Sequence, residues 1–275
     1  MSFKDLLVHV DGSKHAEARV RFAVSLAERF SAHLSGLYAA LPTGMSPLIA
    51  DQFPPEMVED MEARAAQQRE GAEALFKKHT AKMKDKTLWI EGVGDDRAKI
   101  VALAARDSDL TILGQVDPDE VGRGVSFDLP EQVAMASGRP ALVIPYAWDP
   151  RNFGEQVLVA WNASPQAARA VNDALPLLVD SKRVVILTIN AKSGEEVPSS
   201  GIVRHLKRHG VAAEAHPIVA DDIKTSDMIL SRASDESASL IVMGVYGHSR
   251  LRELVLGGVS RDMFQRMTVP ILVAH

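Results

Sequence analysis

The feature that most constrains this chain is an arrangement of residues that occurs twice. An apolar run at 6–10 ends in Asp11, a small residue and a serine, and a second apolar run at 157–161 ends in Asn162 in the same way. Each run leads into a stretch rich in Ala and Arg that is typical of a helix. Each of the two segments is therefore predicted to form a strand, a turn and the start of a helix.

The correspondence returns later in each half. Residues 109–114 and 239–244 are apolar runs that end in glycine, and in both halves a proline that opens another apolar run follows 26 positions after that glycine. Two copies in the same order indicate duplication of one fold. The polar segment 148–154 contains Pro and Gly and suits a linker. We expect two domains, 1–147 and 154–275.

Short runs rich in Val, Ile and Leu alternate with helical stretches in both copies, as in an α/β fold with buried parallel strands. The second copy is expected to have strands at 157–161, 184–189, 214–219, 240–243 and 271–274, and helices near 165–179, 199–209, 225–237 and 258–267. Each copy is predicted to be a doubly wound, open, mainly parallel sheet of five strands. Ligands of such sheets gather beyond the carboxyl ends of the strands, where Asn162 and Gly244 are expected to converge on one crevice.

The segment after 240–243 suits an anionic ligand. Gly244, Gly247 and Gly257 have the spacing G-x2-G-x9-G, and the helix-like run begins at Gly258. Glycine lets the backbone approach an anion closely, and the first N–H groups of a helix have no partner within it. This loop is therefore predicted to hold phosphates.

The strand-end Asp or Asn, the strand that ends in glycine and the glycine loop resemble the universal stress protein family in its tandem form. The resemblance implies an adenine nucleotide α-hydrolase-like fold whose last strands, 141–145 and 271–274, pair to make an internal pseudo-dimer. It also implies ATP as ligand, with phosphate and ribose on the loop and adenosine near the first-strand acid. The residues carried over are Asn162, Gly244, Gly247, Gly257, Gly258, Val259 and Ser260.

Two departures from the family pattern affect this site. Gly258 stands where the family has Ser or Thr, although its N–H and the nearby Ser260 remain available. Asn162 replaces the family Asp, which removes a charge and keeps a hydrogen-bonding side chain.

The first copy departs further from the family pattern. It retains Asp11, but Asp117, Phe127 and Asp128 align with the later glycines of the loop. Two carboxylates and a ring would repel or block a triphosphate. The first copy is therefore expected to bind no nucleotide in the family manner and to have a structural role.

Residues beside the glycine loop have two interpretations. His248 and Ser249 follow Gly247, with Arg250 and Arg252 close behind. Ser249 and one arginine suit charge-assisted contacts to phosphate, and the alternative is a solvated loop. No Ser, Asp or metal-binding residue lies at a sequence spacing that would support His248 as a general base.

The remaining polar clusters have structural explanations. His205 and His209 share a helical face, with His216 beyond, but no carboxylate joins them, so structural histidines are favoured over a metal site. The acidic pairs 95–96 and 221–222 precede equivalent helices, so helix capping explains them better than acid–base chemistry.

Residues 56–83 form an insertion in the first copy. Their apolar residues partly follow a spacing of three to four, with charges between them, which predicts a long amphipathic helix. A surface helix packed on the sheet is expected. A lid or partner-binding role is the alternative.

The amino-acid composition and net charge exclude several classes of function. The absence of cysteine removes disulfides and thiolate chemistry, and the formal charge of −5 gives no support for nucleic-acid binding. We find neither a membrane-spanning apolar run nor a signal peptide, and expect a cytoplasmic protein.

No Gly-x-Ser-x-Gly, P-loop or first-turn dinucleotide motif is present. The favoured function is a stress-response sensor or regulator that binds ATP or a related adenine nucleotide in the second copy, with at most slow hydrolysis, no catalytic residue and no metal. The partners expected are the nucleotide and the other domain of the chain, and a homodimer is the alternative left open. A nucleotide-free scaffold or chaperone-like protein is the alternative, and a nucleotide-processing enzyme is a weaker third.

Overall fold

The structure is a computed structural model that describes residues 2–41, 54–120, 128–190, 199–219, 223–245 and 258–275. The first copy contributes strands β1 (Asp5–His9), β2 (His33–Ala40), β3 (Thr87–Val93), β4 (Leu110–Gly114) and β5 (Ala141–Ile144). The second contributes β6 (Gln156–Ala160), β7 (Arg183–Ile189), β8 (Ala213–Ile218), β9 (Leu240–Gly244) and β10 (Ile271–Ala274). In the second copy each strand lies within one residue of its predicted position.

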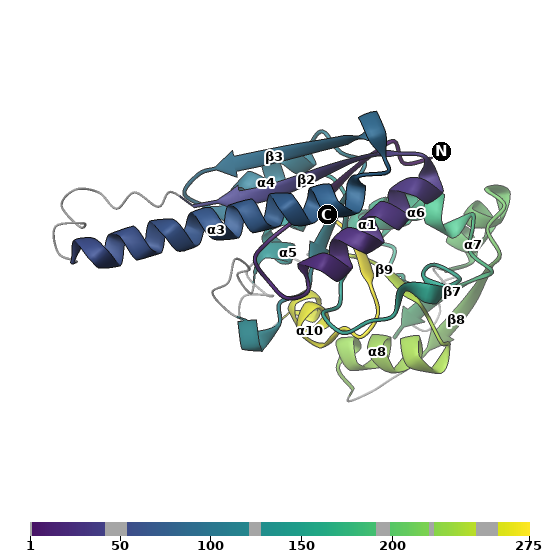
Figure 1. The fold of residues 1–275 in the computed structure, drawn as a ribbon. Coiled ribbons are helices and arrows are strands. Elements are labelled where there is room, and N and C mark those ends of the chain that lie inside the picture. Colours follow the sequence, from purple (N-terminus) through teal and green to yellow (C-terminus); the bar gives the residue numbers. More distant parts are fainter. Residues whose placement is uncertain (1, 42–53, 121–127, 191–198, 220–222, 246–257) are drawn as a thin grey trace.

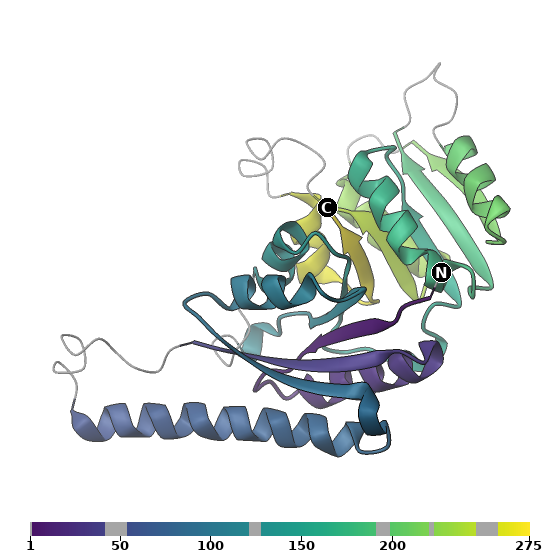
Figure 2. The same ribbon diagram turned by 90° about the horizontal axis from the view of Figure 1, so that it is seen from above.

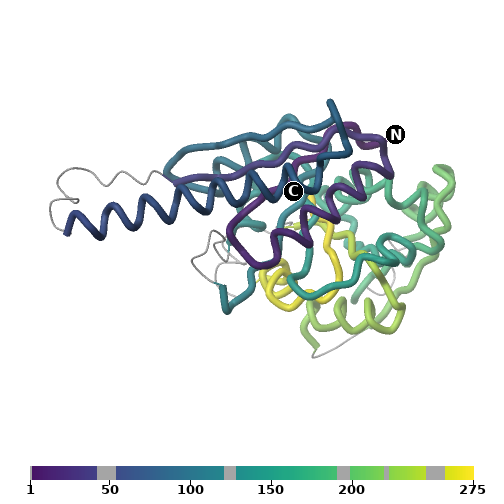
Figure 3. The backbone as a smooth tube through the Cα atoms, viewed as in Figure 1, coloured from purple at the N-terminus to yellow at the C-terminus, as the bar shows by residue number. Residues whose placement is uncertain are grey.

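These strands form one continuous sheet of ten strands in the order β3-β2-β1-β4-β5-β10-β9-β6-β7-β8. All neighbours are parallel except β5 and β10, which are antiparallel with Val143 opposite Ile271 and Ala141 opposite Val273. The expected pairing of the last strands is therefore confirmed, and it joins two five-stranded halves into one sheet. Figure 3 shows the two halves side by side, with the C-terminal strand near the centre.

Helices cover both faces of the sheet (Figure 1). The first copy has α1 (Ala16–Phe30), α3 (Pro55–Thr80), α4 (Arg97–Ala105) and α5 (Leu129–Ala136), and the second has α6 (Pro165–Leu178), α7 (Ser199–Arg208), α8 (Thr225–Asp235) and α10 (Val259–Arg266). Short 3-10 helices are η1 (Lys84–Lys86), η2 (Pro118–Glu120) and η3 (Pro150–Asn152). This alternation confirms the doubly wound α/β fold.

Two hydrophobic cores lie on the two faces of the sheet, because alternate side chains of a strand point to opposite sides. One core combines α1, α3, α6 and α7 with strand residues such as Leu6 and Leu272. The other combines α4, α5, α8 and α10 with residues such as Leu7 and Ile271. Both cores contain residues of both copies, so the two copies share their interior.

The inserted helix α3 packs on the sheet only near its C-terminal end. Its buried residues are Ala72, Phe76 and Thr80. Phe76 stacks near Trp89, with ring centroids 5.5 Å apart, and lies against Gly36, where a Cβ would be 2.6 Å from the ring. The N-terminal half projects beyond the sheet (Figure 2). The predicted helix is confirmed, but only part of it is a packed surface helix.

Candidate functional site

The described part of the predicted site lies at the carboxyl ends of β6 and β9. These strands are parallel neighbours, with Ala160 opposite Met243. Asn162 and Gly244 therefore stand at one edge of the sheet, as adjacent parallel strands require. Gly247, His248, Ser249 and Gly257 lie outside the described residues, as do Arg250, Arg252 and Phe127.

Asn162 is exposed and organises the turn into α6. Its Oδ1 accepts a hydrogen bond from the Ser164 N–H at 3.1 Å, while Ala163 takes a left-handed conformation with φ 57°. Ser164 then caps α6, because its Oγ accepts from the Ala167 N–H at 3.1 Å. The amide group of Asn162 donates to no acceptor within the described ranges, so it is the part of the side chain open to a ligand.

Gly244 has a packing reason to be glycine. A Cβ at this position would lie 2.4 Å from the Ala167 nitrogen and 2.5 Å from the Gln166 carbonyl carbon. The first turn of α6 thus packs directly on the end of β9. Gly244 alone is therefore weak evidence for a ligand, and the anion-binding potential of this edge rests on the helix that follows.

That helix, α10, has no side-chain cap among the described residues. Gly258 is its N-cap residue in an extended conformation, and its carbonyl accepts hydrogen bonds from Arg261 and Asp262 at 3.0 and 3.2 Å. The first N–H groups of a helix lack acceptors within it, and Gly258 has no side-chain oxygen to supply one. Val259 is half-buried, and Ser260 is only 3% exposed, so the Ser260 hydroxyl is not presented at the surface.

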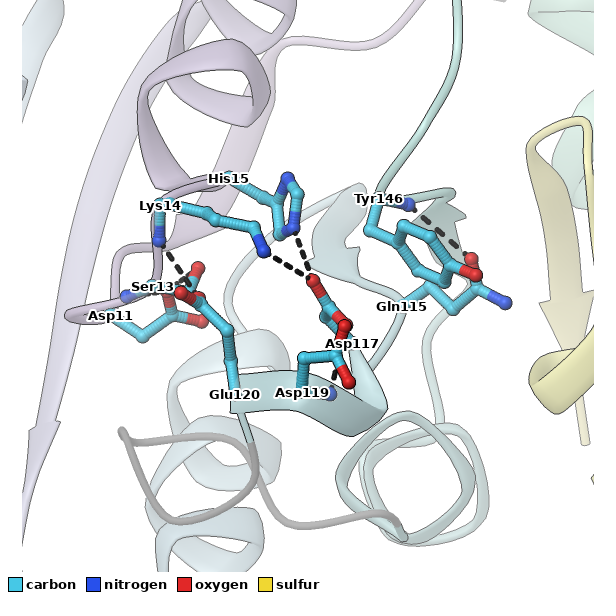
Figure 4. A network of polar contacts seen from close by, with 9 residues as sticks. All are labelled: Asp11, Ser13, Lys14, His15, Gln115, Asp117, Asp119, Glu120 and Tyr146. Atoms are coloured by element: carbon cyan, nitrogen blue, oxygen red, sulfur yellow. Dashed lines mark hydrogen bonds and ion pairs between the residues drawn. The ribbon is translucent and has the colours of Figure 1, made fainter.

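The equivalent edge of the first copy is closed by its own carboxylates (Figure 4). Asp117 Oδ2 lies 2.9 Å from both Lys14 Nζ and His15 Nε2, and Asp117 Oδ1 accepts from the Asp119 N–H at 3.0 Å. The hydrogen bonds from His15 and Lys14 hold the pKa of Asp117 well below its usual range. Glu120 Oε2 accepts from the Lys14 N–H at 2.9 Å. These acids tie the turn after β1 to the segment after β4.

Beneath this closure, Asp11 is neutralised by an arginine. Its Oδ2 lies 2.8 Å from Arg19 Nη2, and its Oδ1 accepts from the Ser13 N–H and Oγ at 3.0 and 2.6 Å. Burial raises the pKa of Asp11, but Arg19, His9 and Ser13 outweigh it and bring the value to about 2. The first-strand acid of this copy is thus an internal structural ion, and the second copy has Asn162 and Ala170 at the two positions.

Sequence reasoning missed Arg19, Lys14, His15 and Glu120 as the residues that occupy this edge. The one available signal was Arg19, a cation on the buried side of a helix otherwise lined by Ala, Val and Phe. The side chains that meet it come from distant segments, so no local spacing pointed to them.

Among the other polar clusters, the predicted helix cap at 95–96 is confirmed. Asp96 caps α4 by accepting from the N–H groups of Ala98 and Lys99 at 2.8 and 3.2 Å. His205 and His209 stack with ring centroids 4.7 Å apart, and His216 Nδ1 lies 3.0 Å from Glu236. Across the described segments, no group of three or more His, Asp or Glu residues is arranged to hold a metal. The pair at 221–222 lies outside them.

No helix in the described portion is both long and apolar enough to cross a membrane.

Comparison with known proteins gives one consistent result. A model of the universal stress protein family matches residues 2–145 and again residues 155–275. The universal stress protein YxiE of Bacillus subtilis (strain 168) is 27% identical over 146 residues, which is 44% of this chain and 98% of that protein.

Solved structures agree on the fold. A universal stress protein of Archaeoglobus fulgidus DSM 4304 superposes with a TM-score of 0.73 at 17% identity, covering 98% of this chain and 95% of that one. The functionally unknown protein PA1789 of Pseudomonas aeruginosa PAO1 gives a TM-score of 0.61 at 12% identity, covering 99% and 92%.

Proposed function

The chain belongs to the universal stress protein family, and from this we propose that its second copy binds ATP or a related adenine nucleotide. The proposed role is that of a cytoplasmic sensor or regulator in a stress response, with residues 1–147 and 154–275 as its two domains. The proposed ligands are Asn162, Gly244, Gly247, His248, Ser249, Gly257 and the start of α10 at Gly258, Val259 and Ser260.

The observation that carries this proposal is the difference between the two sheet edges. In the second copy, the start of α10 and the amide of Asn162 have no side-chain partner within the described residues, and they belong to the β6–β9 edge, where an anion would gain helix N–H groups. In the first copy, Asp117 and Glu120 already bind the groups that face them. We therefore propose one nucleotide per chain.

The test is equilibrium binding of labelled ATP to the full chain. Wild type should bind saturably with a stoichiometry of one. Gly247→Asp should abolish binding, because it places a carboxylate where the first copy has Asp117. Gly201→Asp is the matched control: a Cβ at Gly201 meets no atom within 4 Å, so binding should be unchanged.

Three results would count against the proposal. An absence of saturable binding at millimolar ATP would remove it. Undiminished binding by Gly247→Asp would place the ligand elsewhere. Two nucleotides per chain would contradict the closed first copy. Steady phosphate release that Ser260→Ala abolishes would instead favour a nucleotide-processing enzyme.

A nucleotide-free scaffold is the second candidate, and a specific observation favours it. The projecting half of α3 exposes Met57 and Met61 at 50% and 45% of their surface, and exposed methionines are common at adaptable protein-binding surfaces. Gly244 also has a packing role that needs no ligand. The ATP-binding experiment separates the two candidates, because a scaffold of this kind requires no nucleotide.

A further inference from the structure

A cavity of about 340 Å³ lies in the first copy, away from the proposed nucleotide site. Its walls are α1, the ends of β4 and β5, and the segment that leads from β5 towards the second copy. Every residue that lines it belongs to the described part of the chain. Its volume falls in the range of small-molecule sites, at the small end, which suits a ligand of one or two rings.

In the first copy a side chain lies between α1 and the end of β4, beside the cavity. In the second copy, Ala170 occupies the position of Arg19, and the backbone of α6 packs directly on Gly244. In the first copy, Gly114 faces Arg19 instead: a Cβ at Gly114 would lie 2.0 Å from Arg19 Nη1. Arg19 is 3% exposed and pairs with Asp11, so a guanidinium lies at Gly114 where the second copy has helix backbone at Gly244.

Aromatic side chains form one wall of the cavity. Phe22 and Trp148 meet edge to face with centroids 5.1 Å apart. Tyr146, 41% exposed, stands at the open side, with its ring centroid 5.7 Å from that of His15. Such surfaces favour a flat apolar body, since aromatic pairs gain more than their buried area alone provides.

One cation that lines the cavity is uncompensated. His15 is held by Asp117 at 2.9 Å and Arg19 by Asp11 at 2.8 Å. Arg21 is exposed, lines the cavity, and forms no ion pair with any carboxylate in the described ranges. A guanidinium of this kind binds a planar carboxylate through two parallel hydrogen bonds.

We propose that this cavity binds a small aromatic carboxylate, with its ring against Trp148 and Tyr146 and its carboxylate on Arg21. The apolar wall favours the ring, and Arg21, the one lining cation without an ion pair to a described carboxylate, favours one negative charge. The site is independent of the proposed nucleotide site, which lies in the other copy and uses backbone N–H groups. The proposal therefore adds a second ligand of a different chemical class.

The test uses 4-fluorobenzoate and its neutral analogue 4-fluorobenzamide, followed by fluorine NMR on the full chain. The carboxylate should bind saturably at one site, about tenfold more tightly than the amide, because only the carboxylate forms charge-assisted bonds. Arg21→Gln should weaken carboxylate binding about tenfold and leave amide binding unchanged. Arg208→Gln, an exposed arginine on α7, is the matched control and should change neither.

A second variant tests the cavity itself. Ala18 lies on the exposed side of α1 and lines the cavity, so Ala18→Phe should fill it and abolish binding of both compounds without unfolding the chain. Absence of saturable binding at roughly 10 mM carboxylate would overturn the proposal. So would carboxylate affinity that Arg21→Gln leaves unchanged, or displacement of the probe by saturating ATP. Failure of ATP binding itself would leave these measurements unaffected.

Discussion

The glycines that end β4 and β9 look equivalent in the sequence but face different atoms. A Cβ at Gly244 would meet the backbone of α6, whereas one at Gly114 would meet the end of the Arg19 side chain. Gly244→Ala should therefore cost about 2–3 kcal/mol of unfolding free energy, because a helix must shift, and Gly114→Ala about 1 kcal/mol. Urea unfolding of both variants measures the difference, and equal costs would show that Arg19 is as immovable as helix backbone.

His9 is the residue whose burial should make stability depend on pH. Burial lowers its pKa from 6.5 to about 4, aided by Arg19 and Arg97 and opposed by Asp11. Below pH 6.5, His9 becomes protonated in the unfolded chain, whereas in the folded chain it stays neutral until about pH 4. Stability is therefore lost as the pH falls through this window, by on the order of 2–3 kcal/mol. Protonation of Asp11 lowers the free energy of unfolding further, but only between about pH 4 and 2.

The measurement is the unfolding free energy as a function of pH. His9→Gln should flatten the slope between pH 6.5 and 4, because the titrating group is gone. The same substitution at the exposed His33 is the control and should leave the slope intact. A slope that survives His9→Gln would assign the acid sensitivity to other groups.

At the scale of single elements, α4 shows how one residue of an acidic pair defines a helix start. Asp96 accepts from two backbone N–H groups, while Asp95 is exposed and makes no such contact in the described structure. Asp96→Ala should cost about 1 kcal/mol, and Asp95→Ala no more than a few tenths. Thermal or urea unfolding gives both values. Similar costs would mean that the charge of the pair, rather than the cap, stabilises α4.

Helix α10 connects the two copies as well as starting at the candidate site. At its C-terminal end, the Phe264 and Gln265 carbonyls accept hydrogen bonds from Gln115 Nε2 at 3.0 and 3.1 Å, and Gln115 Oε1 accepts from the Tyr146 N–H at 3.3 Å. One amide of the first copy thus fixes the end of a helix in the second. The helix that would bind the anion is positioned by both halves of the chain.

The molecule as a whole should unfold as one unit. Both hydrophobic cores contain residues of both copies, and Leu142 and Leu272 are paired and fully buried where β5 meets β10. Scanning calorimetry should therefore show one transition whose calorimetric and van't Hoff enthalpies agree.

Leu142→Ala provides the companion measurement. It should lower the stability of that single transition by about 2–5 kcal/mol, because it leaves a cavity at the junction of the two copies. Two resolved transitions in wild type, or a transition of one half alone in this variant, would show instead that the copies unfold separately.

The repeat, the strands, the helices and the pairing of the last strands could all be predicted, the pairing through the family resemblance, whereas its antiparallel direction came from the structure. Strands and helices follow short-range apolar periodicity, and the Asp96 cap follows from a residue next to its helix. The residues proposed to bind nucleotide came from glycine spacing. The structure describes only part of that segment, so the nucleotide site remains a proposal.

By itself, the sequence determined which segments form the sheet and that one fold occurs twice, because a strand or helix is encoded by neighbours a few positions apart. Only the tertiary structure decided which side chains meet at the sheet edge of each copy. His15 meets Asp117, Lys14 meets Glu120, and Gln115 meets the end of α10, contacts that join residues roughly 100 to 150 positions apart. Such contacts depend on which side chains the fold brings together from distant parts of the chain. In the first copy the buried Arg19 side chain lies at Gly114 and lines a cavity, where the second copy has helix backbone against Gly244.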